Sequence, residues 1–369
     1  MSKVLEQLNN KIASSPNDPS LYIERADLLF KLHQYKECAD DCLKAISLDN
    51  DNFTAYGLMG YTHYRLKNYD DALIAAEKAI LLNPNCALPY IVRGNIYSNY
   101  LKENGKALAD YNKAIELDEN SAMAYYNRGI LYYNLSENDK ALADYNKAIE
   151  LDENYAIAYN SRGILYYNLS ENDKALTDYN KAIKLDENYA AYNNRANLYY
   201  SLNENDKALA DYNKAIELNE NYAIAYYNRG ILYGDLNEND KALANYNKAI
   251  ELDENDASAY NNRGVLHRYL SENDKALADY NKAIELNENY ALAYRNRASV
   301  YHEIKHDNKR ALADYEKSRE LYQNESNFSI VRWLDGRIDE IHGRLSKVTD
   351  KEDKAKLILV YQMLNMQKI

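Results

Sequence analysis

The sequence predicts an all-α fold: an α-solenoid of about nine tandem helical hairpins, wound as a right-handed superhelix with capping helices at both ends. The first reason is a fixed period, since one arginine recurs at intervals of 35, 34, 33, 34, 34 and 34 residues (Arg93, Arg128, Arg162, Arg195, Arg229, Arg263 and Arg297). A period of this length is typical of stacked repeats. The second reason is that each unit carries two stretches of helically spaced apolar residues. The third is the scarcity of helix breakers, with 4 Pro and 11 Gly among 369 residues.

Residues 124–155 show the anatomy of one unit. Tyr125, Gly129 and Tyr132 fall on one stripe of a first helix, and residues 141–151 form a broader apolar face on a second helix. The polar break between them offers Ser136 or Asn138 as an N-cap, and Asn154 offers one for the next unit. Because a single hairpin cannot bury both of its faces, neighbouring units are expected to stack into a continuous core.

The chain divides into three segments. Residues 1–18 predict an N-terminal capping helix, and residues 19–323 predict the repeat array, in which repeat six lacks one residue near Ala191. Residues 324–369 break the pattern and read as two amphipathic helices, one from Trp333 to Leu345 and one from Lys354 to Met366. Terminal repeats need a cover for their apolar face, so we expect this tail to cap repeat nine. Docking or dimerisation through the tail is the alternative.

The small and large residues of the unit resemble those of the tetratricopeptide repeat family. The matching positions, in order and spacing, are Tyr125, Gly129, Tyr132, Ala141, Tyr145 and Ala148, and the resemblance covers about residues 19–322. Two features depart from the family pattern. Only Pro84 occupies the usual proline position after the second helix, and Ser or Asn replaces the usual turn glycine (Ser136, Ser170, Asn203, Asn237 and Ser271). These departures bear on the helix ends and leave the fold prediction intact.

Each recurring arginine is followed by an aspartate about 16 residues later. The clearest pairs are Arg128 with Asp144, Arg162 with Asp178, Arg195 with Asp211, and Arg263 with Asp279. Repeat two loses both members together, with Met59 and Ala75 in their places, and repeat seven pairs Arg229 with Asn245. Joint loss favours a structural ion pair between the two helices, because an unpaired, partly buried arginine is costly. Ligand binding by the arginine column is the alternative.

A second stripe of the first helices changes from repeat to repeat. We predict that it binds a partner, since residues under packing constraint should repeat while residues facing a partner need not. Resemblance to the family implies that this face lines the concave surface. The alternative is that these side chains are merely solvated. The predicted binding residues are Tyr126, Ile130, Tyr133, Asn160, Ile164, Tyr167, Asn193, Asn197, Tyr200, Tyr227, Ile231, Arg268 and Arg295.

Charge and motifs narrow the class of protein. The net charge of -12 disfavours nucleic acid and anionic membrane surfaces as partners. We expect no secretory signal and no membrane span, and hence a cytoplasmic protein, and a monomer. Cys38 and Cys42 are expected to pack in the core in preference to binding zinc. No catalytic or phosphate-binding motif occurs, so we expect neither an enzyme nor a cofactor.

The predicted function is a non-catalytic scaffold that binds a peptide or helix of a partner protein in a groove. One alternative is an adaptor that grips the C-terminal carboxylates of chaperones. The family's clamp for carboxylates uses Lys and Arg together with Asn, whereas here Arg268 and Arg295 are the main cations of the variable stripe and no Lys lies on it. A less favoured alternative is an enzyme that uses the C-terminal tail.

Overall fold

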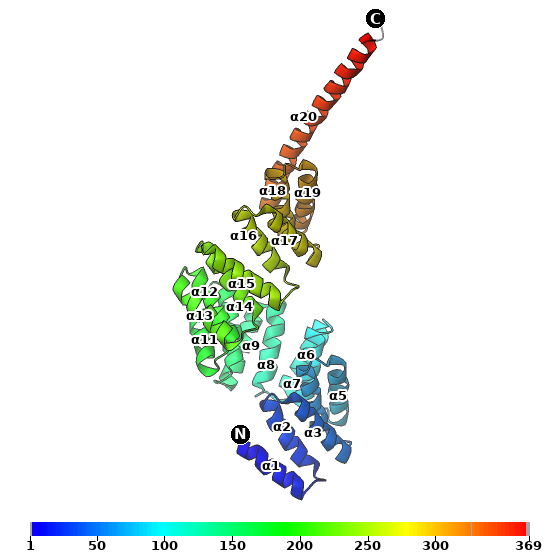
Figure 1. Cartoon of the computed structure of the whole chain (residues 1–369). Helices are drawn as coiled ribbons and strands as arrows, with labels where there is room; N and C mark the ends of the chain where they lie inside the picture. Colours follow the sequence, from blue (N-terminus) through cyan, green and yellow to red (C-terminus); the bar gives the residue numbers. More distant parts are fainter. Residues whose placement is uncertain (1, 326, 367–369) are drawn as a thin grey trace. The chain divides into compact units, whose positions relative to one another are not determined.

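The computed structural model describes residues 2–325 and 327–366, with side chains in 3–325 and 327–347. In these residues every regular element is a helix (Figure 1). Nine hairpins follow α1 (Ser2–Ser14) and precede α20 (Phe328–Met366). Their first helices are α2 (Pro19–Lys31), α4 (Phe53–Arg65), α6 (Ala87–Asn99), α8 (Ala122–Asn134), α10 (Ala156–Asn168), α12 (Tyr189–Ser201), α14 (Ala223–Asp235), α16 (Ala257–Tyr269) and α18 (Ala291–Glu303). Their second helices are α3 (Tyr35–Leu48), α5 (Tyr69–Leu82), α7 (Asn104–Leu117), α9 (Asn138–Leu151), α11 (Asn172–Leu185), α13 (Asn205–Leu218), α15 (Asn239–Leu252), α17 (Asn273–Leu286) and α19 (Asn308–Asn324).

The chain divides into two compact units, residues 1–194 and 195–369, and the boundary in the sequence falls within the residues of α12. The first unit holds α1 to α11, and the second holds α13 to α20. This boundary falls inside the predicted repeat array, residues 19–323. It differs from the boundaries of the predicted segments 1–18, 19–323 and 324–369, which were drawn from the sequence pattern. Each unit is described by itself below.

Each hairpin turns through one residue with left-handed backbone geometry. The turn residues predicted from the missing glycine, Ser136, Ser170, Asn203, Asn237 and Ser271, all have φ between 59° and 63°. The predicted caps were wrong. Helix α9 has Glu137 as its N-cap and α10 has Tyr155, and neither side chain makes a capping hydrogen bond. Because Ser136 adopts the left-handed turn, it cannot also occupy the extended N-cap position.

Close packing within a hairpin explains the glycine of the first helix. A Cβ atom on Gly129 would lie 2.8 Å from Cε1 of Tyr145, which is far inside contact distance. Tyr145 is 2% exposed and packs with Ala141, Ala148 and Leu165 in one core cluster. Leu165 belongs to the next hairpin, so one buried tyrosine joins two repeats, as the stacking argument predicts.

The recurring arginine and aspartate form bidentate ion pairs between the two helices of a hairpin. Arg Nε and Nη2 donate to the two carboxylate oxygens of Asp at 2.5–2.9 Å in seven hairpins of the described residues. The four pairs singled out above, Arg128–Asp144, Arg162–Asp178, Arg195–Asp211 and Arg263–Asp279, are among them. The hydrogen bond with Asp144 raises the pKa of Arg128, whereas burial lowers the pKa of Arg229, whose partner on the second helix is the neutral Asn245.

The same arginine also reaches the preceding repeat, a contact that the sequence analysis missed. Arg162 Nη1 donates to Oδ1 of Asn146 at 2.7 Å, and Asn146 belongs to the second helix one repeat earlier. Equivalent bonds join Arg128 to Asn112, Arg229 to Asn213, Arg263 to Asn247 and Arg297 to Asn281. The available signal was the Asn that follows the second-helix tyrosine in repeats three to eight. Each of these five guanidinium groups therefore joins the two helices of its own hairpin and also joins that hairpin to the preceding one.

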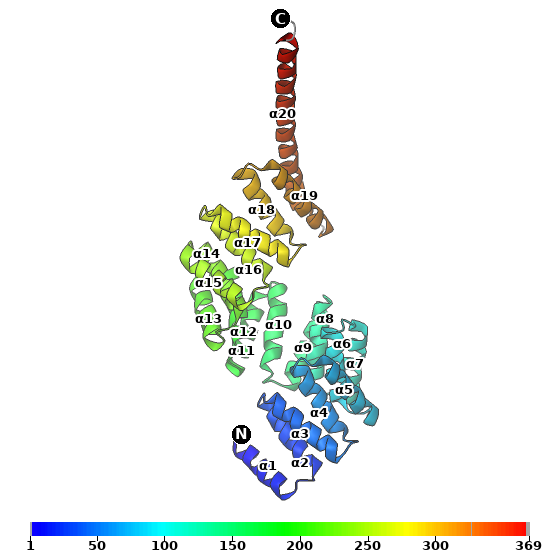
Figure 2. The ribbon, with the colours of Figure 1, turned by 45° about the vertical axis from the view of Figure 1, so that its right-hand side comes forward.

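Amphipathic helices close both ends of the array. Leu8 and Ile12 of α1 are buried, and Cys38 and Cys42 are fully buried core residues of the first hairpin. The start of α20 packs Val331, Leu334, Ile338 and Ile341 against α18 and α19. The prediction of two tail helices was wrong, since α20 is one continuous helix that runs on past the last hairpin (Figures 1 and 2). The side chains of residues 348–366, which include the second predicted helix, lie outside the description.

Candidate protein-binding face

The predicted binding residues occupy three recurring positions of the first helices. Each of these helices has 13 residues, and the variable stripe falls at positions 5, 9 and 12 counted from the first residue. In the first unit these positions carry Tyr126, Ile130 and Tyr133 on α8, Asn160, Ile164 and Tyr167 on α10, and Asn193 on α12. In the second unit they carry Asn197 and Tyr200 on α12, Tyr227 and Ile231 on α14, Arg268 on α16, and Arg295 on α18.

Position 5 contacts position 6 of the next repeat. Tyr126 and Ser161 share a hydrogen bond of 3.2 Å between hydroxyls. Asn194 donates to Oδ1 of Asn160 at 3.0 Å, and Asn262 donates to the hydroxyl of Tyr227 at 2.9 Å. Burial raises the pKa of Tyr227 to about 12. We call these contacts the position 5/6 pairs.

Position 12 contacts position 13 of the next repeat in the same manner. Asn168 donates to the hydroxyl of Tyr133, and the hydroxyl of Tyr200 donates to Asp235. Burial and the hydrogen bond to Asp235 raise the pKa of Tyr200 to about 12. Arg268 donates to Glu303 at 2.6 Å. These position 12/13 pairs, like the position 5/6 pairs, join residues about 35 apart in sequence, which is why a reading of single repeats missed them.

Position 9 is an amide in α6 and α12 and an aliphatic side chain in α8, α10, α14 and α16, and the hydrogen bonding of the second-helix tyrosine differs between the two kinds. The hydroxyl of Tyr212 donates to Asn197 at 2.6 Å, and that of Tyr111 donates to Asn95 at 2.7 Å. Position 9 of α16 is Val265, and the buried hydroxyl of Tyr280 beneath it has no hydrogen-bond partner among the described residues. A buried, unpaired hydroxyl destabilises the folded state.

Val265→Asn is therefore expected to stabilise the second unit by about 0.5–1 kcal/mol, since the new amide gives the Tyr280 hydroxyl an acceptor at the spacing seen for Asn197 and Tyr212. Val265 is 45% exposed, so little apolar burial is lost. Thermal unfolding checks the prediction, with Tyr280→Phe as the matched background. The gain should vanish in that background, and an equal gain in both would show that it has another cause.

The structure also shows which predicted binding residues are available to a partner. Tyr126 and Asn193 are buried, at 8% and 2% exposure, and so lie inside the stack. Arg268 is engaged by Glu303, and the guanidinium of Arg295 lies 6.0 Å from the ring centroid of Trp333 on α20. The half-buried aliphatic residues Ile130, Ile164 and Ile231 remain at the surface with Tyr167. Some residues of the variable stripe thus make contacts between repeats, whereas others are accessible to a partner.

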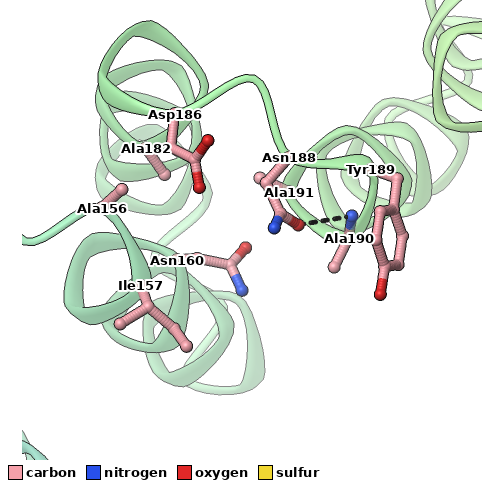
Figure 3. Close-up of a pocket in the computed structure, with 9 residues that line it drawn as sticks. All are labelled: Ala156, Ile157, Asn160, Ala182, Asp186, Asn188, Tyr189, Ala190 and Ala191. Atoms are coloured by element: carbon pink, nitrogen blue, oxygen red, sulfur yellow. Dashed lines mark hydrogen bonds between the residues drawn. The ribbon is translucent and has the colours of Figure 1, made fainter. Parts of the chain in front are cut away.

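The missing residue of repeat six leaves a cavity within the first unit. It has a volume of about 290 Å³ and lies between α10, the end of α11 and the start of α12 (Figure 3). Asn160 points into this space, while the ring of Tyr189 lies beyond Ala190. In the repeat before, the corresponding residues are the large pair Tyr126 and Tyr155, whose ring centroids lie 5.2 Å apart. Replacement of one tyrosine by Asn and the shorter connection between α11 and α12, residues 186–188 against residues 152–155 one repeat earlier, together account for the cavity.

In the part of the chain that the structure describes, no three His, Cys, Asp or Glu side chains converge as metal ligands. No described helix combines the length and the apolar character needed to cross a bilayer.

The geometry defines a class of protein: an α-solenoid of stacked helical hairpins. The chain belongs to the tetratricopeptide repeat family. The sequence patterns described as tetratricopeptide repeat match residues 19–52, 53–86, 122–155, 156–189 and 257–290, and those described as TPR repeat match 100–136, 196–237 and 232–268. This fold supports a role in protein–protein interaction in general.

Known proteins resemble the chain chiefly in fold. The chain is 35% identical over 79 residues to sperm-associated antigen 1 of Homo sapiens, and this match covers 21% of the chain and 8% of that protein. The APC/C hetero-tetramer Cut9-Hcn1 superposes with a TM-score of 0.66 at 17% identity, over 80% of this chain and 58% of that one. Yeast Tom70 superposes with a TM-score of 0.57 at 17% identity, over 95% and 94%.

Proposed function

We propose that the chain is a non-catalytic adaptor, and that the variable stripe of its first helices binds a peptide segment or helix of a partner protein. The observation that carries the proposal is the half-buried aliphatic and aromatic surface of α8 and α10, formed by Ile130, Ile164 and Tyr167. Stripe residues change between repeats, whereas the packing side keeps Gly129 and its counterparts. A surface with this pattern offers different contacts along its length on a constant scaffold.

The chemistry of this surface suits a peptide. Position 5/6 and 12/13 pairs fix neighbouring helices against each other, so the surface is preorganised and little entropy is lost when it binds. Isoleucine and tyrosine provide apolar anchors, and the amide of Asn160 provides hydrogen bonds to a peptide backbone. The net charge of -12 favours a basic partner and opposes nucleic acid.

The test uses the intact chain to capture partners from a cell lysate, with identification by mass spectrometry. Ile164→Glu is expected to reduce capture about tenfold or more, because it places a carboxylate in the apolar centre of the interface. Ile74→Glu is the matched control, since Ile74 is 66% exposed on the second helix α5 of the same unit. Circular dichroism must show both variants folded. Equal loss in both, or capture retained by Ile164→Glu, would place the partner elsewhere on the molecule.

A further inference from the structure

The second unit contains a slot from which one tyrosine ring is absent. Position 12 of the first helix is Tyr133 in α8, Tyr167 in α10 and Tyr200 in α12, but it is Gly234 in α14. A Cβ atom built on Gly234 would meet nothing within 4 Å. A pocket of about 300 Å³ lies at this position, lined in part by Ile231, Tyr246, Val265 and Leu266.

The filled slots show what fits into the open one. Tyr133 packs against the core cluster that contains Tyr145 of its own hairpin and Leu165 of the next, and Tyr200 packs against the cluster that contains Tyr212 and Leu232. In the open slot the equivalent residues are Tyr246 and Leu266, and both line the pocket. They are more exposed than their counterparts: Leu266 is 7% exposed, against 0% for Leu165 and Leu232, and Tyr246 is 5% exposed, against 2% for Tyr145 and 1% for Tyr212.

Polar groups at the rim define the rest of the ligand. Asp235, which accepts the hydrogen bond from Tyr200, lines the pocket and is exposed. Tyr269 occupies position 13 of the next helix, where Asn168 or Asp235 meets the tyrosine hydroxyl in the filled slots, and it is 67% exposed. A hydroxyl entering the slot would therefore approach the Tyr269 side chain, and a cation beside it would approach the Asp235 carboxylate.

We propose that this slot binds a tyrosine side chain from a basic segment of a partner protein, the partner's ring taking the place that Gly234 leaves empty. The ring would pack between Tyr246 and Leu266, as Tyr133 and Tyr200 pack in their own slots. The Asp235 carboxylate and the net charge of -12 select basic neighbours of that tyrosine. This inference rests on the proposed function and names the partner's chemistry at one point of the stripe.

The test measures binding of p-cresol, the side chain of tyrosine, to the intact chain by methyl NMR of isoleucine, leucine and valine. Millimolar binding is expected for so small a probe, with chemical-shift changes at Ile231, Val265 and Leu266. Gly234→Tyr should weaken this binding at least about tenfold by filling the slot, whereas Gly234→Ala should leave it within about twofold. Gly234→Leu serves as a second filling variant. Shift changes confined to other residues, or full binding by both filled variants, would overturn the proposal.

The charge preference has its own test. The acetylated, amidated tripeptide Lys-Tyr-Lys should bind wild type at least about threefold more tightly than Glu-Tyr-Glu at low salt. Asp235→Asn should narrow that difference, and equal affinities in wild type would refute the basic partner.

The two proposals fail separately. Loss of partner capture in Ile164→Glu with no p-cresol binding leaves the adaptor function standing without the slot. Slot binding with capture unchanged by Ile164→Glu removes the proposed face of the first unit.

Discussion

Arg162→Met is expected to destabilise the hairpin of α10 and α11 by about 3–5 kcal/mol, the cost of leaving a buried carboxylate without its partner. Asp178 is 3% exposed, and both of its oxygens accept hydrogen bonds from Arg162. Amide hydrogen exchange of residues 156–185 measures the effect locally, which matters because a solenoid need not unfold as a single unit.

The chain itself supplies the control for this experiment. Repeat two carries Met59 and Ala75 in place of the pair, so Arg162→Met combined with Asp178→Ala reproduces a natural hairpin. The double variant should recover most of the loss, and the coupling energy should therefore be large. Additive costs for the two single changes would contradict the ion-pair interpretation. Arg162 also donates to Asn146, and this bond stays broken in the double variant, so full recovery is not expected.

The array is expected to lose helical structure in alkali, between about pH 10 and 12. Burial raises the pKa of both Tyr227 and Tyr280 to about 12, from the ordinary value near 10. A raised folded-state pKa means that the unfolded chain loses these protons first. The stabilisation is therefore complete below about pH 10 and is lost as the pH rises towards 12. Tyrosinate absorbance and circular dichroism should change together for the buried tyrosines.

Tyr280→Phe tests the physical cause of this transition. The variant loses no hydrogen bond, because the Tyr280 hydroxyl has none among the described residues, and it removes a group that ionises when exposed. Its midpoint of alkaline unfolding should be higher than that of wild type, and its stability at neutral pH should not fall. If all the tyrosines of the wild-type protein titrated near pH 10 while the helical signal persisted, burial would not govern their ionisation.

The fold was predictable because the period and the packing pattern are repeated many times. Gly129 and Tyr145 recur at the same spacing, so each copy independently supports the hairpin. The helix ends were less predictable, since Ser136 suits both an N-cap and a left-handed turn. The continuous helix α20 was less predictable, since the polar residues after Leu345 interrupt the apolar pattern although they include neither Gly nor Pro.

The candidate site was only partly predictable, for a specific physical reason. Variation along the stripe was interpreted as partner contact, but part of it reflects contacts between one repeat and the next. Tyr200 with Asp235 and Arg268 with Glu303 differ in chemistry and occupy equivalent places. When repeats are compared one by one, both residues of such a pair vary. The comparison does not reveal that the two residues vary together. Ile164 is partly exposed whereas Tyr126 is buried, and this difference in side-chain exposure also depends on how the repeats pack.

The position 12/13 pairs have a consequence for how such a chain can evolve. Near-identical repeats favour recombination between their copies, and such recombination duplicates, deletes or reorders repeats. Each position 12/13 pair joins side chains from two successive repeats. Exchange of repeats seven and eight would therefore place Tyr200 against Tyr269 and Gly234 against Glu303. Repeats four and five both carry Tyr at position 12 and Asn at position 13, so their exchange creates no such mismatch. The position 12/13 pairs therefore permit exchange of repeats four and five, whereas they favour a fixed order of repeats seven and eight.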